Sequence, residues 1–120
     1  MSYTPTAQFK TWTMTWTGFS MNPTATMEYC HEGKRCSFSI SRSANGTSNA
    51  AATTVTLPLD AGETDEQIIP FQVISNGTTS IGYLRTRTGN NVADILLGDG
   101  TNPAASGVKS IQGNGWYITK

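Results

Sequence analysis

Apolar and polar side chains alternate without interruption in residues 11–17, which read Thr-Trp-Thr-Met-Thr-Trp-Thr. Successive side chains of a β-strand point to opposite faces, so Trp12, Met14 and Trp16 share one face and the threonines share the other. Branched threonine also suits a pleated surface that is buried on one side only. We therefore predict a strand whose tryptophan face lies in the core.

Other segments of strand character follow along the chain and are separated by turn residues. Asn45-Gly46 and Asn76-Gly77 are pairs that tolerate the positive φ of tight turns. The next two segments are predicted to form a hairpin around residues 31–35, and the segments beside Asn76-Gly77 are predicted to form a second one. The predicted strands are 24–30, 36–43, 53–59, 68–75, 80–88, 92–97 and 116–119.

The length of 120 residues is typical of one domain. No segment keeps the apolar period of a helix, and no internal repeat or linker divides the chain. We expect an N-terminal arm at residues 1–10 and one all-β domain at residues 11–120. Short strands with regularly spaced turns predict a single antiparallel β-sandwich of about eight strands, similar to a jelly roll.

Charge excludes two classes of partner. Eight basic and eight acidic residues cancel to a formal net charge of zero, and they are scattered along the chain. Nucleic acids and anionic membranes are bound by basic stripes, so neither is an expected partner. The N-terminus lacks the basic and apolar segments of a signal peptide, and no apolar run approaches the about 18 residues of a membrane helix. We expect a soluble chain without a leader.

Catalytic residue sets are also lacking. His31 is the only histidine, and it lies in a predicted hairpin turn, where a solvent-exposed histidine is the expected interpretation. Asp94 and Asp99 could formally serve as the carboxylate pair of a glycoside hydrolase, but nothing in the sequence sets their separation. We predict no catalytic residues and no enzymatic activity.

The two cysteines raise the questions of metal binding and of a disulfide. Cys30, Cys36 and one histidine cannot supply four zinc ligands, and the acidic stretch at residues 60–66 lacks the spacing of a calcium loop. We expect no metal and no cofactor. A hairpin centred on Gly33 would place the cysteines opposite each other, within reach of a disulfide. Because the chain shows no export signal, two reduced thiols remain an equal alternative.

Aromatic residues have two interpretations in such a domain. Exposed, they could form a platform on which sugar rings stack. Buried, they would belong to the core, which is the commoner outcome in a domain of this size. The residues concerned are Trp12, Trp16, Tyr29 and Trp116.

Several blocks, in order and spacing, resemble a module of bacteriophage and prophage structural proteins found at the ends of tail fibres and in minor virion proteins. The similarity is clearest over residues 11–59 and continues weakly through residues 106–111 to the C-terminal strand. The blocks are residues 15–20 (Thr-Trp-Thr-Gly-Phe-Ser), Asn22-Pro23-Thr24, Tyr29, Gly33-Lys34, residues 43–50 and Thr56-Leu57-Pro58.

The resemblance implies a β-sandwich that assembles as a homotrimer on the surface of a virion, after synthesis in the host cytoplasm. The implied function is a phage structural protein of tail-fibre or capsid-decoration type, with other virion proteins and a host glycan or protein receptor as partners. The alternative is a carbohydrate-binding module without enzymatic activity and without a virion.

Large apolar residues beside predicted breaks and strand ends would be partly exposed in a lone sandwich. Contiguous exposed apolar surface usually marks an interface, so these residues are the predicted contacts between copies of the chain. They are Tyr3, Phe9, Phe19, Met21 and Phe71.

The alternation in residues 11–17 predicts unequal effects of two substitutions. Trp16→Ala should reduce the free energy of unfolding by about 3–5 kcal/mol, because it deletes a large buried aromatic ring. Thr15→Ala, on the opposite face, should cost less than about 1 kcal/mol. Urea denaturation measures both, and small, equal losses would contradict the assigned faces.

Overall fold

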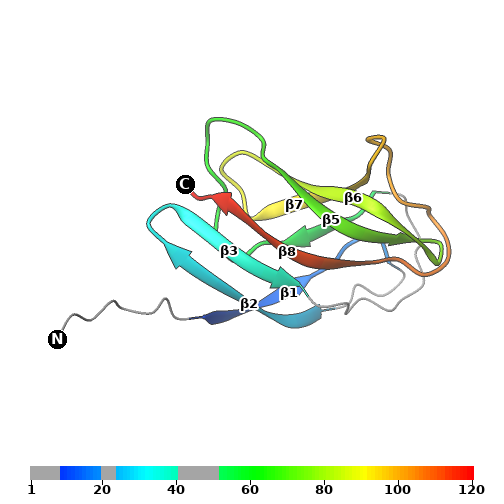
Figure 1. The fold of residues 1–120 in the computed structure, drawn as a ribbon, viewed down its shortest axis with the longest axis horizontal. Helices are drawn as coiled ribbons and strands as arrows, with labels where there is room; N and C mark the ends of the chain where they lie inside the picture. Colours follow the sequence, from blue (N-terminus) through cyan, green and yellow to red (C-terminus); the bar gives the residue numbers. More distant parts are fainter. Residues whose placement is uncertain (1–8, 20–23, 41–51) are drawn as a thin grey trace.

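The structure, a computed structural model, describes residues 9–19, 24–40 and 52–120. These residues form strands without a helix (Figure 1), so no helix among them is long and apolar enough to cross a membrane. Each predicted strand segment contains a strand, although β4 is shorter than predicted and β8 is longer. The strands are β1 (Lys10–Thr15), β2 (Thr24–Glu32), β3 (Arg35–Ile40), β4 (Thr54–Thr56), β5 (Ile68–Ser75), β6 (Thr78–Thr86), β7 (Val92–Leu97) and β8 (Ser110–Ile118).

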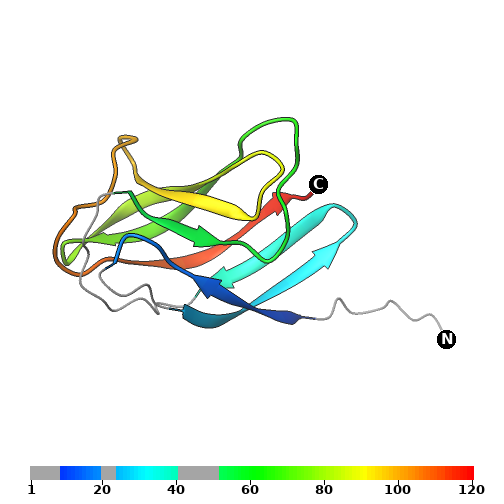
Figure 2. The ribbon, with the colours of Figure 1, turned by 180° about the vertical axis from the view of Figure 1, so that it is seen from behind.

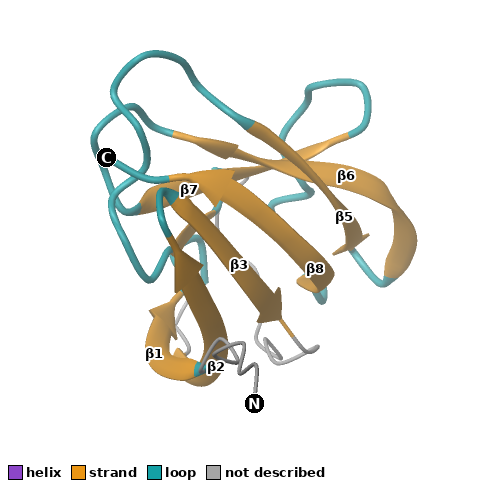
Figure 3. Ribbon diagram, turned by 60° about the vertical axis from the view of Figure 1, so that its left-hand side comes forward, coloured by secondary structure: helices purple, strands orange, loops and turns teal. Residues whose placement is uncertain are grey.

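All eight strands belong to one antiparallel sheet in the order β1-β2-β3-β8-β5-β6-β7-β4. The two end strands, β1 and β4, also lie beside each other (Figure 2), where Trp16 and Val55 form an isolated bridge. The N–H of Thr17 donates to the carbonyl of Thr54 at 3.0 Å. The sheet is therefore almost closed into a barrel, as the oblique view of Figure 3 also shows.

The prediction of a sandwich similar to a jelly roll was wrong, because the strands form one nearly closed, barrel-like sheet. All-β architecture, antiparallel pairing and the number of strands are confirmed. Alternation identifies the buried face of a strand but not its neighbours, so the strand order could not be derived from it.

β8 joins the two halves of the barrel. Its first residues, 110–112, pair with β5, whereas residues 113–118 pair with β3. The inner face at this junction carries Gly113 and Gly115. A Cβ atom on Gly115 would lie 2.4 Å from Cγ2 of Ile69 and 3.2 Å from a ring carbon of Phe71. The glycines thus leave room for side chains from both neighbouring strands.

Phe38 of β3 and Phe71 of β5 fill that room. Their rings are stacked, with centroids 5.6 Å apart and an interplanar angle of 13°, and Phe38 pairs directly with Gly115. Tyr117 packs against the edge of Phe38 at a centroid distance of 5.8 Å. These three rings form the centre of the core where the two halves of the barrel meet.

The tryptophan face predicted for residues 11–17 is confirmed. Met14 and Trp16 are buried, and Trp12 is half-buried against the core. The Trp12 Nε1–H donates to the carbonyl of Thr56 at 3.0 Å, which adds a side-chain tie across the junction of β1 and β4.

The β2–β3 hairpin is confirmed, but its register corrects the expected cysteine pair. Glu32 pairs with Arg35 around a two-residue turn, so Cys36 lies opposite His31 and Cys30 lies opposite Ser37. Adjacent positions of a strand point to opposite faces. Both cysteines are free and buried, and only Cys36 belongs to the main core cluster. The two thiols therefore do not face each other across the hairpin.

The second predicted hairpin joins β5 and β6 through Asn76-Gly77. Both residues have positive φ, 49° and 78°, which asparagine and glycine tolerate best. Ser75 and Thr78 are the last pair of the ladder. Here the turn chemistry was sufficient to predict the structure.

Two glycine substitutions test the β8 junction. Gly115→Ala should lower the free energy of unfolding by about 1–3 kcal/mol, because the new methyl group overlaps Ile69 and forces the aromatic stack to move. Gly62→Ala is the control, since its Cβ atom would meet its nearest neighbour at an ordinary 3.4 Å. Thermal or urea unfolding that gave equal effects would contradict a tight junction.

Candidate binding surface

His31, the sequence candidate for a base, ties the hairpin to the end of the chain. Its Nε2 lies 3.2 Å from Oγ1 of Thr119, and that hydroxyl donates to the carbonyl of Lys34 at 3.1 Å. The histidine is thus engaged in a contact that holds the C-terminus against the hairpin turn.

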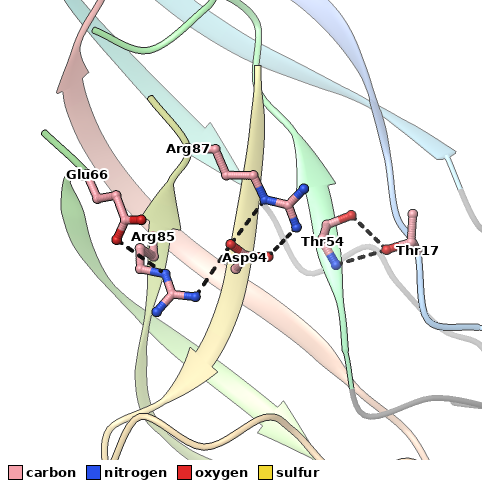
Figure 4. A network of polar contacts seen from close by, with 6 residues as sticks. All are labelled: Thr17, Thr54, Glu66, Arg85, Arg87 and Asp94. Carbon is pink, nitrogen blue, oxygen red and sulfur yellow. Dashed lines mark hydrogen bonds and ion pairs between the residues drawn. The ribbon is translucent and has the colours of Figure 1, made fainter. Parts of the chain in front are cut away.

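The carboxylates of Asp94 and Asp99 are held by separate partners. Asp94 accepts from Arg87 at 2.7 Å and forms an ion pair with Arg85 at 3.7 Å, within the network of Figure 4. Asp99 accepts hydrogen bonds from the hydroxyl and N–H of Thr101, which lower the pKa of its carboxyl. A glycosidase acid needs a raised pKa, so Asp99 is unsuited to that role.

Metal ligands are not assembled either: among the described residues, no three His, Cys, Asp or Glu side chains lie together in a way that could hold an ion. Two of the acidic residues between β4 and β5 form ion pairs with basic side chains. Glu63 lies 3.1 Å from Lys120, and Glu66 lies 3.7 Å from Arg85.

Lys109 is a buried cation that the sequence analysis did not single out. Its side chain is 1% exposed, donates to the hydroxyl of Thr53, and lies 5.2 Å from the ring centroid of Phe19. Burial disfavours the charged form and lowers the pKa of Lys109 to about 8. Because the amine is enclosed, we assign it a packing role.

The outer face of β8 presents a different surface. Tyr117 points into the core, so its neighbours Trp116 and Ile118 point outward, and they are 50% and 42% exposed. The guanidinium carbon of Arg35 lies 4.7 Å from the Trp116 ring centroid, a cation–π contact that restrains the indole. Trp116 therefore lies on β8, in the middle of the sheet, and its ring is restrained by Arg35.

A hollow of about 550 Å³ lies on one side of Trp116. It extends over the outer faces of β2, β3 and β8, and five polar side chains line it together with the aromatic rings of Phe9 and Trp116. We call it the Trp116 hollow, and its principal side chains are Phe9, Glu28, Arg35, Ser37, Ser39, Asn114 and Trp116.

A second hollow, of about 370 Å³, lies on the other side of Trp116, where β5 and β8 separate. Continuing their register would bring Pro70 opposite Asn114, but proline has no N–H to donate. The side chain of Gln67 replaces the missing ladder, donating to the carbonyl of Ile118 at 2.8 Å and accepting from its N–H at 2.6 Å. Ile68, 56% exposed, lines this gap.

The predicted contacts between copies need correction. Phe9 is 67% exposed, as an interface residue should be, but Phe19 and Phe71 are buried at 4% and 3%. Phe19 packs against the edge of Trp16 and Phe71 stacks on Phe38, so both belong to the core of the single chain. Tyr3 and Met21 lie outside the described residues.

The exposed apolar residues beside β8 were missed by the sequence analysis. It predicted a strand from residue 116 onward, whereas β8 begins at Ser110. Had the strand been extended, the pattern Gly113-x-Gly115-x-Tyr117 would have indicated one inward face and placed Trp116 outside. Of the four aromatic residues weighed as a sugar platform, Trp116 is the exposed one, while Trp16 is confirmed as core.

Comparisons with known proteins identify the fold. No family description and no curated protein matches the sequence. The C-terminal receptor-binding domain of the avian reovirus fibre sigmaC matches with a TM-score of 0.57 and 16% sequence identity, over 98% of this chain and 76% of that chain. A reovirus attachment protein, sigma1, solved in complex with alpha-2,3-sialyllactose, gives a TM-score of 0.48 and 11% identity over 92% and 64%. The first likeness shows a shared fold.

Lys109 predicts a pH-dependent contribution to stability. Its pKa falls from 10.5 in an ordinary lysine to about 8 in the fold, so between these values the unfolded chain holds more protons and stability rises with pH, by up to about 1.4 kcal/mol per unit. Burial raises the pKa of Cys36 and of Tyr117. These two groups therefore lower the stability of the fold as pH rises above their ordinary pKa values of 9.0 and 10.0.

Comparing the chain with a Lys109→Met variant isolates the lysine, because both proteins keep Cys36 and Tyr117. The difference in unfolding free energy, chain minus variant, should increase between pH 8 and 10.5. Urea unfolding at several pH values measures it. Parallel stability profiles would contradict the lowered pKa.

Proposed function

We propose that this chain is a receptor-contacting domain of a viral attachment protein of the fibre type. The observation that carries the proposal is the likeness of fold to the C-terminal receptor-binding domain of the avian reovirus fibre, which extends over 98% of the chain. The sequence identity is 16%, and the receptor group and the type of virus are proposed from this chain's own residues.

The architecture suits a domain that binds without catalysing. The sheet closes through the Trp16–Val55 bridge, which reduces the free strand edges that would otherwise recruit other chains. The three residues weighed for catalysis, His31, Asp94 and Asp99, each contact a partner within the chain. Binding therefore depends on the outer faces of the barrel, and we propose that the protein has no enzymatic activity.

Resemblance of sequence blocks to phage and prophage modules adds two finer proposals. The particle is a bacteriophage, with this domain on a tail fibre or as a decoration of the capsid, and the domain is a homotrimer. Phe19 and Phe71 lie in the core, so we propose that the copies contact each other through exposed aliphatic residues beside Trp116. We call Ile68, Pro70 and Ile118 the aliphatic flank; Ile68 and Ile118 are 56% and 42% exposed.

Immunoelectron microscopy tests the proposal. A labelled antibody raised against the purified chain should decorate particles released from cells that express it with its neighbouring genes. Label at fibre tips would place the domain in an attachment organelle, and label spread over the head would favour decoration. Purified particles without label would contradict a virion protein.

A second candidate function is a carbohydrate-binding module without a virion. It is favoured by one observation, the half-exposed indole of Trp116 beside a hollow that polar side chains also line. Sugar binding by an isolated monomer together with unlabelled particles would support this alternative over the attachment domain.

Self-association gives a direct prediction. Light scattering coupled to size exclusion should report a mass near three chains that persists on dilution to low micromolar concentration. The double substitution Ile68→Ser/Ile118→Ser should shift the mass to one chain, because it removes exposed apolar surface from the aliphatic flank. Ile81→Ser is the matched control, since Ile81 is 71% exposed and does not line either hollow beside Trp116. A clean monomer at high concentration would contradict the trimer.

A further inference from the structure

We propose that the Trp116 hollow binds a neutral pyranose sugar, which stacks on the indole of Trp116 and is hydrogen-bonded by a row of polar side chains from three strands. The inference rests on the proposed function, because it names the class of receptor group that an attachment domain would contact.

The aromatic platform is positioned before any ligand arrives. Trp116 lies within the β3–β8 ladder, where it pairs with Ser37, and Arg35 restrains its ring from a distance of 4.7 Å. Arg35 covers part of the ring, but half of the residue's surface remains exposed, and this open part of the indole is where the sugar would stack. The apolar side of a pyranose ring is suited to an aromatic surface of this kind, and a restrained ring loses little conformational freedom on binding.

The polar partners form a straight row beside the platform. Glu28 pairs with Ser39 across β2 and β3, and Ser39 pairs with Asn114 across β3 and β8. Their side chains share the outer face and line the same hollow as Trp116. The carboxylate of Glu28 accepts hydrogen bonds, whereas the hydroxyl of Ser39 and the amide of Asn114 both donate and accept them. These groups match the hydroxyl groups around a sugar ring, which also donate and accept.

Strand geometry sets the spacing between platform and row. Asn114 lies two residues before Trp116 on β8, and two residues of a strand span about 6.6 Å. This separation is close to the width of a pyranose ring with its hydroxyl groups, so a ring resting on the indole can reach the row. A hollow of about 550 Å³ has room for such a ring and a neighbour.

Charge favours a neutral sugar over an acidic one. The hollow is lined by one carboxylate, Glu28, and one guanidinium, Arg35. These two opposite charges cancel, so the hollow has no net charge that would attract the carboxylate of a sialic or uronic acid. Binding should therefore depend little on ionic strength, because no net charge is neutralised.

An oligosaccharide array probed with the full chain tests the site. The array should carry glucose, galactose and N-acetylglucosamine oligomers beside sialylated and uronic acid oligomers. Neutral oligomers should be retained, and their dissociation constant, from isothermal titration calorimetry, should change less than about twofold between about 0.05 and 0.5 M salt.

Variants then locate the bound sugar. Trp116→Ala should weaken binding at least about tenfold and Asn114→Ala several-fold, because they remove the platform and one end of the row. Ile81→Ala, an exposed apolar residue outside the hollow, should bind as the unaltered chain does. Circular dichroism confirms that each variant is folded, which is expected because Trp116 and Asn114 lie on the outer face.

Three results would overturn the proposal: no neutral oligomer retained at millimolar concentration, retention that survives Trp116→Ala, or retention of acidic oligomers alone with strong dependence on salt. If Trp116→Ala left the binding of every sugar unchanged but altered the oligomeric state, the hollow would be assigned to contact with a second copy of the chain. Labelled particles without sugar binding would overturn only this inference, and sugar binding without labelled particles would overturn only the attachment function.

Discussion

The stack of Phe38 on Phe71 across β8 is the contact on which the architecture depends. β3 and β5 lie on either side of β8, and the rings of Phe38 and Phe71 meet because Gly113 and Gly115 of β8 carry no side chain. A methyl group at residue 115 would overlap Ile69. The sheet can therefore curve at β8 and bring its end strands, β1 and β4, together at the Trp16–Val55 bridge. Closure at one side follows from close packing at the other.

The same strand determines the outer surface. Because side chains alternate, the glycines and Tyr117 that face inward oblige Asn114, Trp116 and Ile118 to face outward. The strand that packs most closely in the core thus also carries the exposed indole of Trp116. A binding group mounted there is supported by ladders with β3 and, farther along, with β5. Its preorganisation comes from the fold and needs no separate supporting loop.

Sequence patterns predicted local structure well and spatial neighbours poorly. Strict alternation in residues 11–17 and the Asn76-Gly77 turn were sufficient because each acts through adjacent residues. The placement of Cys30 opposite Cys36 was wrong because a shift of one residue in a hairpin register moves a side chain to the opposite face. Phe19 and Phe71 were assigned to the surface because proximity to a predicted strand end says little about burial. The Trp116 hollow draws on three strands and could not be assembled without their pairing.

The separation of β5 from β8 explains how a nearly closed barrel can still offer a recessed surface. A complete ladder would have flattened the region beside Trp116, but Pro70 cannot donate a backbone hydrogen bond and the strands part there. The end of the gap is closed by Gln67, whose side-chain amide bonds both the N–H and the carbonyl of Ile118. The backbone of β8 is therefore satisfied at Ile118, although its ladder with β5 ends at Gln112. The recess beside Trp116 and the side-chain contact that closes its end thus both originate in residues 67–70, at the start of β5.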